Sequence, residues 1–83
     1  MYNKIEPVLR MTKNEAAERY PDSFILMRMD GKNPFNPMGM VLYVGNDGDE
    51  LFSLAMKFDD ATNCGVSEGL NIQRSLGGVV VSA

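Results

Sequence analysis

The sequence predicts an α+β fold: a small three- or four-stranded, mostly antiparallel sheet, packed by one amphipathic helix and one short N-terminal helix. Two observations lead to this prediction. Nearly continuous runs of β-favouring apolar residues alternate with stretches of helical period, and turns rich in glycine, proline and asparagine separate them. The chain has 83 residues, 45% of them hydrophobic and 23% charged, so we expect 1–83 to be a single small globular domain.

The N-terminal part begins without a clear period. Residues 1–11 are of mixed character and contain a proline, and we expect them to form an N-terminal arm. The following "MTKNEAAERYP" carries a capping box, in which Thr12 accepts from the Glu15 N–H and the Glu15 side chain accepts from the Thr12 N–H. Because the next proline disfavours helical backbone at Tyr20, a short helix over 13–20 is predicted.

Two strands should follow this helix. The stretch "SFILMRM", residues 23–29, is apolar on both faces except at Arg28, and "MVLYV", residues 40–44, is a second apolar run of β-favouring residues. The loop "DGKNPFNPMG" between them is long and rich in turn residues. We therefore expect the two strands to pair antiparallel as a wide hairpin.

Residues 48–58 change to a helical period. Asp47 is the expected N-cap, and Glu50 is its expected capping-box partner. The apolar side chains of this amphipathic helix stand at i, i+3, i+4 and i+7 and should face the sheet: Leu51, Leu54, Ala55 and Phe58.

The turn "GNDG" before this helix raises the question of phosphate binding, because helix N-termini attract anions. Asp47, Asp49 and Glu50 already occupy that end and would repel a phosphate, and neither glycine-rich nucleotide motif is present. The same acids do not match the spacing of a calcium-binding EF-hand loop. We interpret the turn as a connection, and we expect no cofactor and no metal ion.

The chain has no histidine and a single cysteine. A histidine-activated nucleophile, a histidine-ligated metal and an intrachain disulfide are therefore excluded. Cys64 has no lysine or arginine beside it in the sequence, so we interpret it as a small buried or half-buried residue. We predict that the protein is not an enzyme, and an activity of Cys64 or of paired carboxylates is the weakest alternative.

The last third of the sequence leaves a choice open. Residues 64–68 could be a short third strand, or part of a loop that leads to a turn of helix around 70–75. The valines in "GGVVVSA" predict a terminal strand at 79–81, central in the sheet or covered by another chain. The second strand, the amphipathic helix and the third strand could form one right-handed crossover.

Apolar surface is the main indication of a partner. The predicted strands are apolar on both faces, and the short first helix covers its face poorly, so we expect a second copy of the chain to complete the burial. Methionines beside the proline-rich loop suit an adaptable contact, and one arginine near the Gly77–Gly78 pair suits a carboxylate or phosphate on a partner. The expected partner-binding residues are Phe35, Met38, Met40, Arg74, Val79 and Val81.

The charge of the chain narrows the class of partner. With a net charge of −3 and a pI near 4.7, the chain has no broad positive field, so we expect no binding to nucleic acid. No segment has the length of a signal peptide core or of a membrane span. We therefore expect a cytoplasmic protein with no membrane contact, which agrees with the single cysteine.

Two segments, "TKNEAAERYPDSFILM" and "GMVLYVGNDGDELFSLA", carry a resemblance. In their order of capped helix, Tyr-Pro, hairpin, acidic helix start and closing strand, they resemble a family of small uncharacterised bacterial α+β domains of unknown function. The resemblance covers residues 12–82, and the "DGKNPFNPMG" loop is an insertion relative to the simplest pattern. It implies a compact interaction domain without catalytic residues, of a kind sometimes found among accessory genes of mobile elements.

Two hypotheses about function follow. The first is a non-enzymatic protein–protein interaction module, a homodimer that also binds a host protein, of bacterial or mobile-element origin. The alternative is a small-molecule or nucleotide-binding protein that uses the loop at 45–50 and the segment at 73–78.

Overall fold

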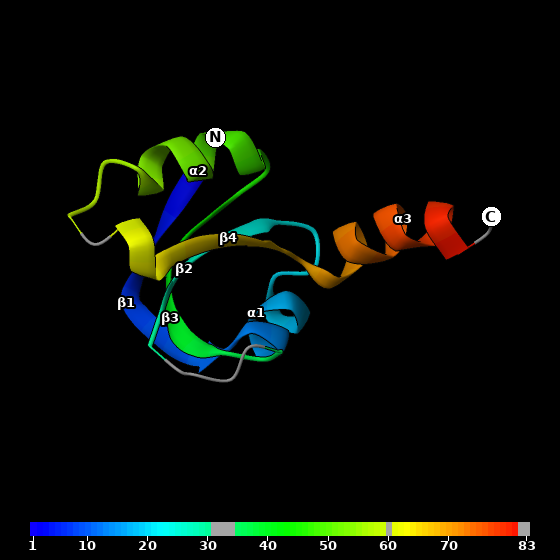
Figure 1. Cartoon of the computed structure of the whole chain (residues 1–83), viewed down its shortest axis with the longest axis horizontal. Coiled ribbons are helices and arrows are strands. Elements are labelled where there is room, and N and C mark those ends of the chain that lie inside the picture. Colours follow the sequence, from blue (N-terminus) through cyan, green and yellow to red (C-terminus); the bar gives the residue numbers. More distant parts are fainter. Residues whose placement is uncertain (31–34, 60, 82–83) are drawn as a thin grey trace.

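The computed structural model describes residues 1–30, 35–59 and 61–81, with the backbone alone for Ala61 and for 76–81. Along the chain, strands and helices follow one another in this order (Figure 1): β1 Tyr2–Thr12, α1 Lys13–Arg19, β2 Phe24–Met29, β3 Met38–Gly45, α2 Gly48–Ala55, a 3-10 turn η1 Ala61–Asn63, β4 Cys64–Glu68 and α3 Leu70–Val81. Among these described helices, none is both long and apolar enough to cross a membrane.

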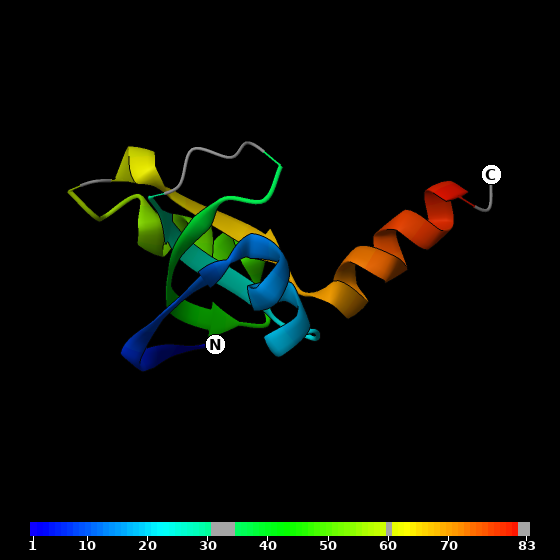
Figure 2. The same ribbon diagram turned by 90° about the horizontal axis from the view of Figure 1, so that it is seen from below.

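Within the described residues, four strands form one sheet in the order β1-β3-β2-β4, and every neighbouring pair is antiparallel. The α+β fold and the antiparallel hairpin of β2 and β3 are thereby confirmed. Since β4 is antiparallel to β2 and β2 is antiparallel to β3, β4 runs parallel to β3 with β2 between them. The connection through α2 is therefore a crossover that passes over β2 (Figures 1 and 2).

The N-terminal arm expected over 1–11 is wrong, because β1 is an edge strand of the sheet. It pairs with β3 from Tyr2 opposite Gly45 to Thr12 opposite Met38. The pairing register shifts between Lys4 and Leu9, and this interruption removes the regular alternation by which a strand is recognised in a sequence.

The predicted first helix is confirmed as α1, with its complete capping box. The Glu15 N–H donates to Thr12 Oγ1 at 3.2 Å, and the Thr12 N–H donates to Glu15 Oε1 at 3.0 Å. Hydrogen bonding of the Glu15 carboxyl to the Thr12 backbone N–H, and second to the Thr12 side chain, lowers the pKa of this carboxyl, because it stabilises the charged form. The helix ends at Arg19, one residue short of the predicted end, because the following proline disfavours helical backbone at Tyr20.

The second helix is shorter than predicted and is capped on one side only. Asp47 is confirmed as the N-cap, since its Oδ1 accepts from the N–H groups of Asp49 at 3.0 Å and Glu50 at 3.3 Å. The return half of the box is not formed, because the Glu50 carboxylate lies 2.7 Å from the Met1 ammonium group. The helix stops at Ala55 in tight turns rather than at residue 58.

Each face of the sheet has its own buried cluster. On the α1 side, the buried residues are Met11, Ala16, Ile25, Met27, Val41 and Val44. On the α2 side, Leu26 packs with Leu51 and Ala55 of the helix. Ile25, Leu26, Met27 and Val41 have no exposed surface, so these strand positions are covered within one chain. Their burial does not require a partner, and association with a second copy stays a prediction.

The C-terminal segment is helical, and the terminal strand predicted at 79–81 is wrong. Cys64–Glu68 is the strand β4, which resolves the choice left open by the sequence, and α3 follows directly. The first turn of α3 is fixed to the domain, since the Asn71 N–H donates to the Pro21 carbonyl at 2.9 Å and its side chain to Asp22 at 2.8 Å. The backbone is therefore helical before the valines begin, and a short apolar run is compatible with either a helix or a strand.

Candidate functional site

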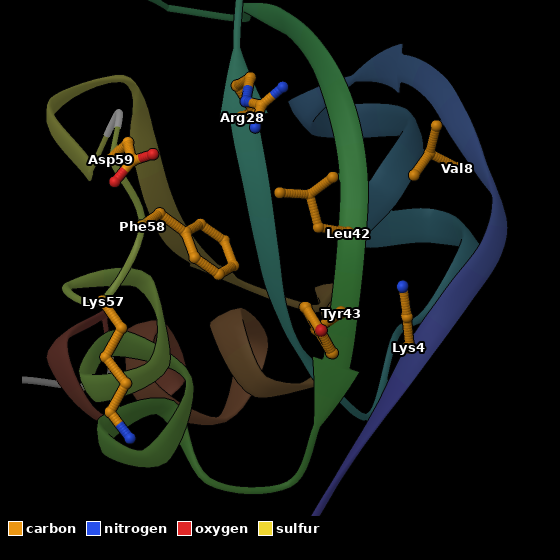
Figure 3. A pocket seen from close by; sticks show the side chains of 8 residues that line it. All are labelled: Lys4, Val8, Arg28, Leu42, Tyr43, Lys57, Phe58 and Asp59. Atoms are coloured by element: carbon orange, nitrogen blue, oxygen red, sulfur yellow. The ribbon is translucent and has the colours of Figure 1, made fainter.

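An open groove of about 580 Å³ lies on the sheet face that α2 covers only in part (Figure 3). It is bounded by β1 on one side and by the segment that follows α2 on the other. Its lining residues come from distant parts of the sequence: Lys4, Val8, Arg28, Leu42, Tyr43, Lys57, Phe58 and Asp59.

Irregular pairing around Leu42 opens the groove. On β3, Tyr43 pairs with Lys4 of β1 and with Leu26 of β2, whereas the next pairs on both sides involve Val41. Leu42 therefore has no paired residue on either neighbouring strand, and on β1 the four residues 5–8 between Lys4 and Leu9 are also outside the pairing. Such bulges bend a strand and re-aim its side chains, and here β1 separates from β3 and leaves space above Leu42.

The middle of the groove is apolar and aromatic. In Figure 3, Phe58 points toward Leu42 from one side, while Val8 lies on the other. The rings of Tyr43 and Phe58 are 6.5 Å apart, and Tyr2 meets Tyr43 edge-on at 5.5 Å. Val8 is 47% exposed, an apolar side chain that β1 holds toward solvent. A partner that places an apolar group here would bury these surfaces.

The polar side chains lie around this apolar centre. Arg28 and Asp59 lie at one end of the groove, Lys4 lies near Tyr43 at the other, and Lys57 lies on the rim (Figure 3). Lys4 Nζ is 3.5 Å from the exposed Glu6 carboxylate, a surface pair of small energy. Among the described residues that line the groove, three are cations and one is a carboxylate, whereas the whole chain carries a net charge of −3.

The predicted partner-binding residues do not form this site. Phe35 is 89% exposed before β3, and Met38 and Met40 are half-buried on β3. Arg74 is exposed on α3. The predictions at Val79 and Val81 concern side chains outside the described ones. None of the four described residues lines the groove, so the sequence analysis missed it.

One signal in the sequence pointed to the groove. Arg28 is the one charged residue in an otherwise apolar strand, and it reaches the groove from β2. Lys4 and Val8 lie in the stretch interpreted as an arm, so neither could be placed beside it. Their contribution depends on the register of β1, which no local pattern encodes.

At the helix start that the alternative hypothesis uses, several first-turn donors are already occupied. The N–H groups of Asp49 and Glu50 both donate to Asp47, and the Glu50 carboxylate pairs with the Met1 ammonium group. The segment at 73–78 lies on α3, whose first turn hydrogen-bonds to Pro21 and Asp22. The geometry at 45–50 therefore favours a capped helix over a nucleotide cradle.

Side chains suited to holding a metal ion do not gather in the described part of the chain, where no group of three His, Cys, Asp or Glu residues was found. Cys64 is a half-buried residue at the start of β4, and it packs against the Leu26 cluster.

The chain matches no protein-family model, no curated protein and no solved structure. The resemblance to small bacterial domains of unknown function stays a prediction, and the function has to be argued from the groove itself.

Proposed function

We propose that the chain is a non-enzymatic protein-binding domain, which holds an acidic segment of a partner protein in the groove and also associates with a second copy of itself. The packing of α1 and α2 on opposite faces would hold the strands that line the groove in place. The proposal keeps the cytoplasmic and bacterial setting that the sequence and the resemblance imply.

The observation that supports this function is the combination of an apolar middle with separated cations. Phe58 and Leu42 offer area to a leucine or aromatic side chain, while Arg28 and Lys4 stand at opposite ends. A segment with carboxylates on both sides of an apolar residue would place a negative charge near the cation at each end and an apolar side chain over the middle. The cations do not converge on one point, as a phosphate would require.

Selection from a library of random short peptides tests the proposal. On the immobilised protein, we expect enrichment of peptides in which Asp or Glu flanks Leu, Ile or Phe. Selection on the Leu42→Asp variant should lose this enrichment, because a carboxylate would then stand in the apolar centre. No difference between the two selections would contradict the proposal.

Charge reversal provides the quantitative test. The double variant Lys4→Glu, Lys57→Glu should weaken binding of a selected peptide by about tenfold or more, measured by fluorescence anisotropy at low salt. The matched control is Lys13→Glu, Arg19→Glu, which makes the same charge change on α1. Equal weakening in both variants would show a non-specific effect of net charge and would overturn the groove as the site.

A small amphiphilic carboxylate could use the same groups, since the volume of the groove is in the range of ligand pockets. This alternative replaces the loop at 45–50 as the small-molecule site. Competition distinguishes the two functions. The small-molecule function would be favoured if a fatty acid displaces the selected peptide and also binds more tightly than every selected peptide.

A further inference from the structure

Two large apolar side chains are exposed on the solvent side of α2. Phe52 and Met56 stand one helical turn apart and are 58% and 62% exposed, while Leu51 and Ala55 of the same helix are buried against the sheet. Ser53, also exposed, lies next to the pair. The helix forms the outer layer on its side of the sheet, at the upper edge of the molecule in Figure 1. This apolar pair is therefore accessible to a partner in the described part of the chain.

Opposite charges lie at the two ends of this side of the helix. Asp49 stands three residues before Phe52, in the first turn of α2, and Lys57 follows directly after Met56. Both charged side chains are exposed, and neither forms an ion pair with another described residue. In Figure 3, the Lys57 side chain points away from the middle of the groove. About 12 Å of helix axis separates Asp49 from Lys57, so each is positioned to pair with a second helix rather than with the other.

We propose that α2 packs antiparallel against α2 of a second copy, about a twofold axis at Ser53, a proposal that rests on the self-association part of the proposed function. In this register Asp49 faces Lys57 of the second copy, and the twofold axis repeats the same pair at the other end. Phe52 then packs beside Met56 of the second copy. The small side chain at the axis lets the two helices approach closely, because the distance between helix axes depends on the side chains at the contact.

The distribution of charge favours a second copy in this orientation over other partners. The acidic segment proposed for the groove would meet the like charge of Asp49 here. A parallel copy would place Asp49 beside Asp49, whereas the antiparallel copy has no like charges in contact along this side of the helix. Two helices of eight residues bury less area than a standard interface, so we expect a weak dimer, with a dissociation constant on the order of 100 μM.

Exchange of the two charges tests the antiparallel register. Asp49→Lys and Lys57→Asp each place like charges at both ends of the contact and should weaken dimerisation about tenfold or more, in sedimentation experiments at up to about 500 μM. An equal mixture of the two variants should restore the dimer, because each chain then carries the charge that the other needs. Glu18→Lys makes the same charge change on α1 and should leave the dimer intact. A mixture as monomeric as its components, or a monomeric wild type, would overturn the proposal.

A cross-link at the axis is the second test. Ser53→Cys would place two thiols across the twofold axis, so we expect mild oxidation to give a covalent dimer. Glu18→Cys, an exposed thiol on α1, and the wild type with its half-buried Cys64 are the controls and should stay unlinked. Linking of Ser53→Cys that is no faster than that of Glu18→Cys would overturn the register.

Peptide binding separates a failure of this pairing from a failure of the proposed function. Asp49 does not line the groove, so Asp49→Lys should bind a selected peptide as the wild type does while its dimerisation is weakened. Peptide binding that is retained in a wild type without self-association would overturn the pairing alone. A wild type that dimerises with the expected charge dependence but selects no peptide supports the pairing and contradicts the groove as the binding site.

Discussion

The two faces of the sheet are built on the same strands, yet one is closed and the other is left open. On the α1 side, Met11 from β1 completes a cluster in which Ile25 and Met27 are fully buried. On the α2 side, the helix ends at Ala55, and beyond it the bulge at Leu42 widens into the groove. A strand that is apolar on both faces is thus buried where Met11 and Ala16 cover it, and it borders an open groove beyond the end of α2.

The largest expected difference is in folding stability. Ile25→Ala, on the closed face, should lower the free energy of unfolding by about 3 kcal/mol, because it removes fully buried methyl groups and leaves a cavity. Leu42→Ala, in the groove, should cost about 1 kcal/mol or less, since this half-buried side chain has solvent beside it. Urea unfolding followed by circular dichroism measures both.

Leu51→Ala tests whether the cost of a substitution depends on the burial of the side chain or on the face of the sheet where it lies. Leu51 is fully buried although it belongs to the α2 side, so its replacement should cost about as much as that of Ile25. If instead Leu42→Ala is as destabilising as Leu51→Ala, the groove is part of the core, and the contrast between the two faces is wrong.

Local sequence signals predicted several of the helices and strands, whereas the groove depends on how the strands pair. The capping box at Thr12 and the N-cap at Asp47 are both present in the structure, because each depends on residues within one turn. The two strands of the hairpin were likewise predicted from short apolar runs. The groove was missed because Lys4 and Arg28 meet only through the pairing of β1 and β2 with β3, and pairing register is not a local property.

The two errors at the chain ends have a common physical cause. At the N-terminus the bulge in β1 hides the two-residue period of a strand, and at the C-terminus three successive valines offer no period at all. The context decides in both places: β3 offers an edge to β1, whereas the hydrogen bond from Asn71 to Pro21 starts a helix. Propensity alone would place the valines in a strand.

The helix caps should contribute less to the free energy of unfolding than the buried side chains do, and the contribution of the α1 cap should depend on pH. Thr12→Ala removes one half of the box that begins α1 and should cost about 1 kcal/mol, as should Asp47→Ala at the start of α2. Because hydrogen bonds lower the folded-state pKa of Glu15, its charged form stabilises the fold above the unfolded-state pKa, and this is lost as pH falls through the folded value.

Glu15→Gln isolates this pH dependence, since glutamine can accept the hydrogen bond but does not titrate. We expect wild type to be more stable than the variant at neutral pH and the difference to vanish in acid, in parallel thermal unfolding scans. A difference that is constant over this pH range would show that the carboxylate charge does not contribute to the α1 start.

The smallest expected effect locates the point where the closed face ends. Gly65 of β4 pairs with Met27 of β2, and a Cβ built at Gly65 has no contact within 4 Å. Gly65→Ala should therefore stabilise the fold by about 0.5 kcal/mol, by restricting the unfolded chain. At Gly39 the same change would bring Cβ to 2.5 Å from the Arg28 carbonyl oxygen, so Gly39→Ala should destabilise by about 2 kcal/mol. If the two substitutions change the free energy of unfolding in opposite directions, the face is open at the β4 edge. If both are destabilising, the closed face extends to that edge.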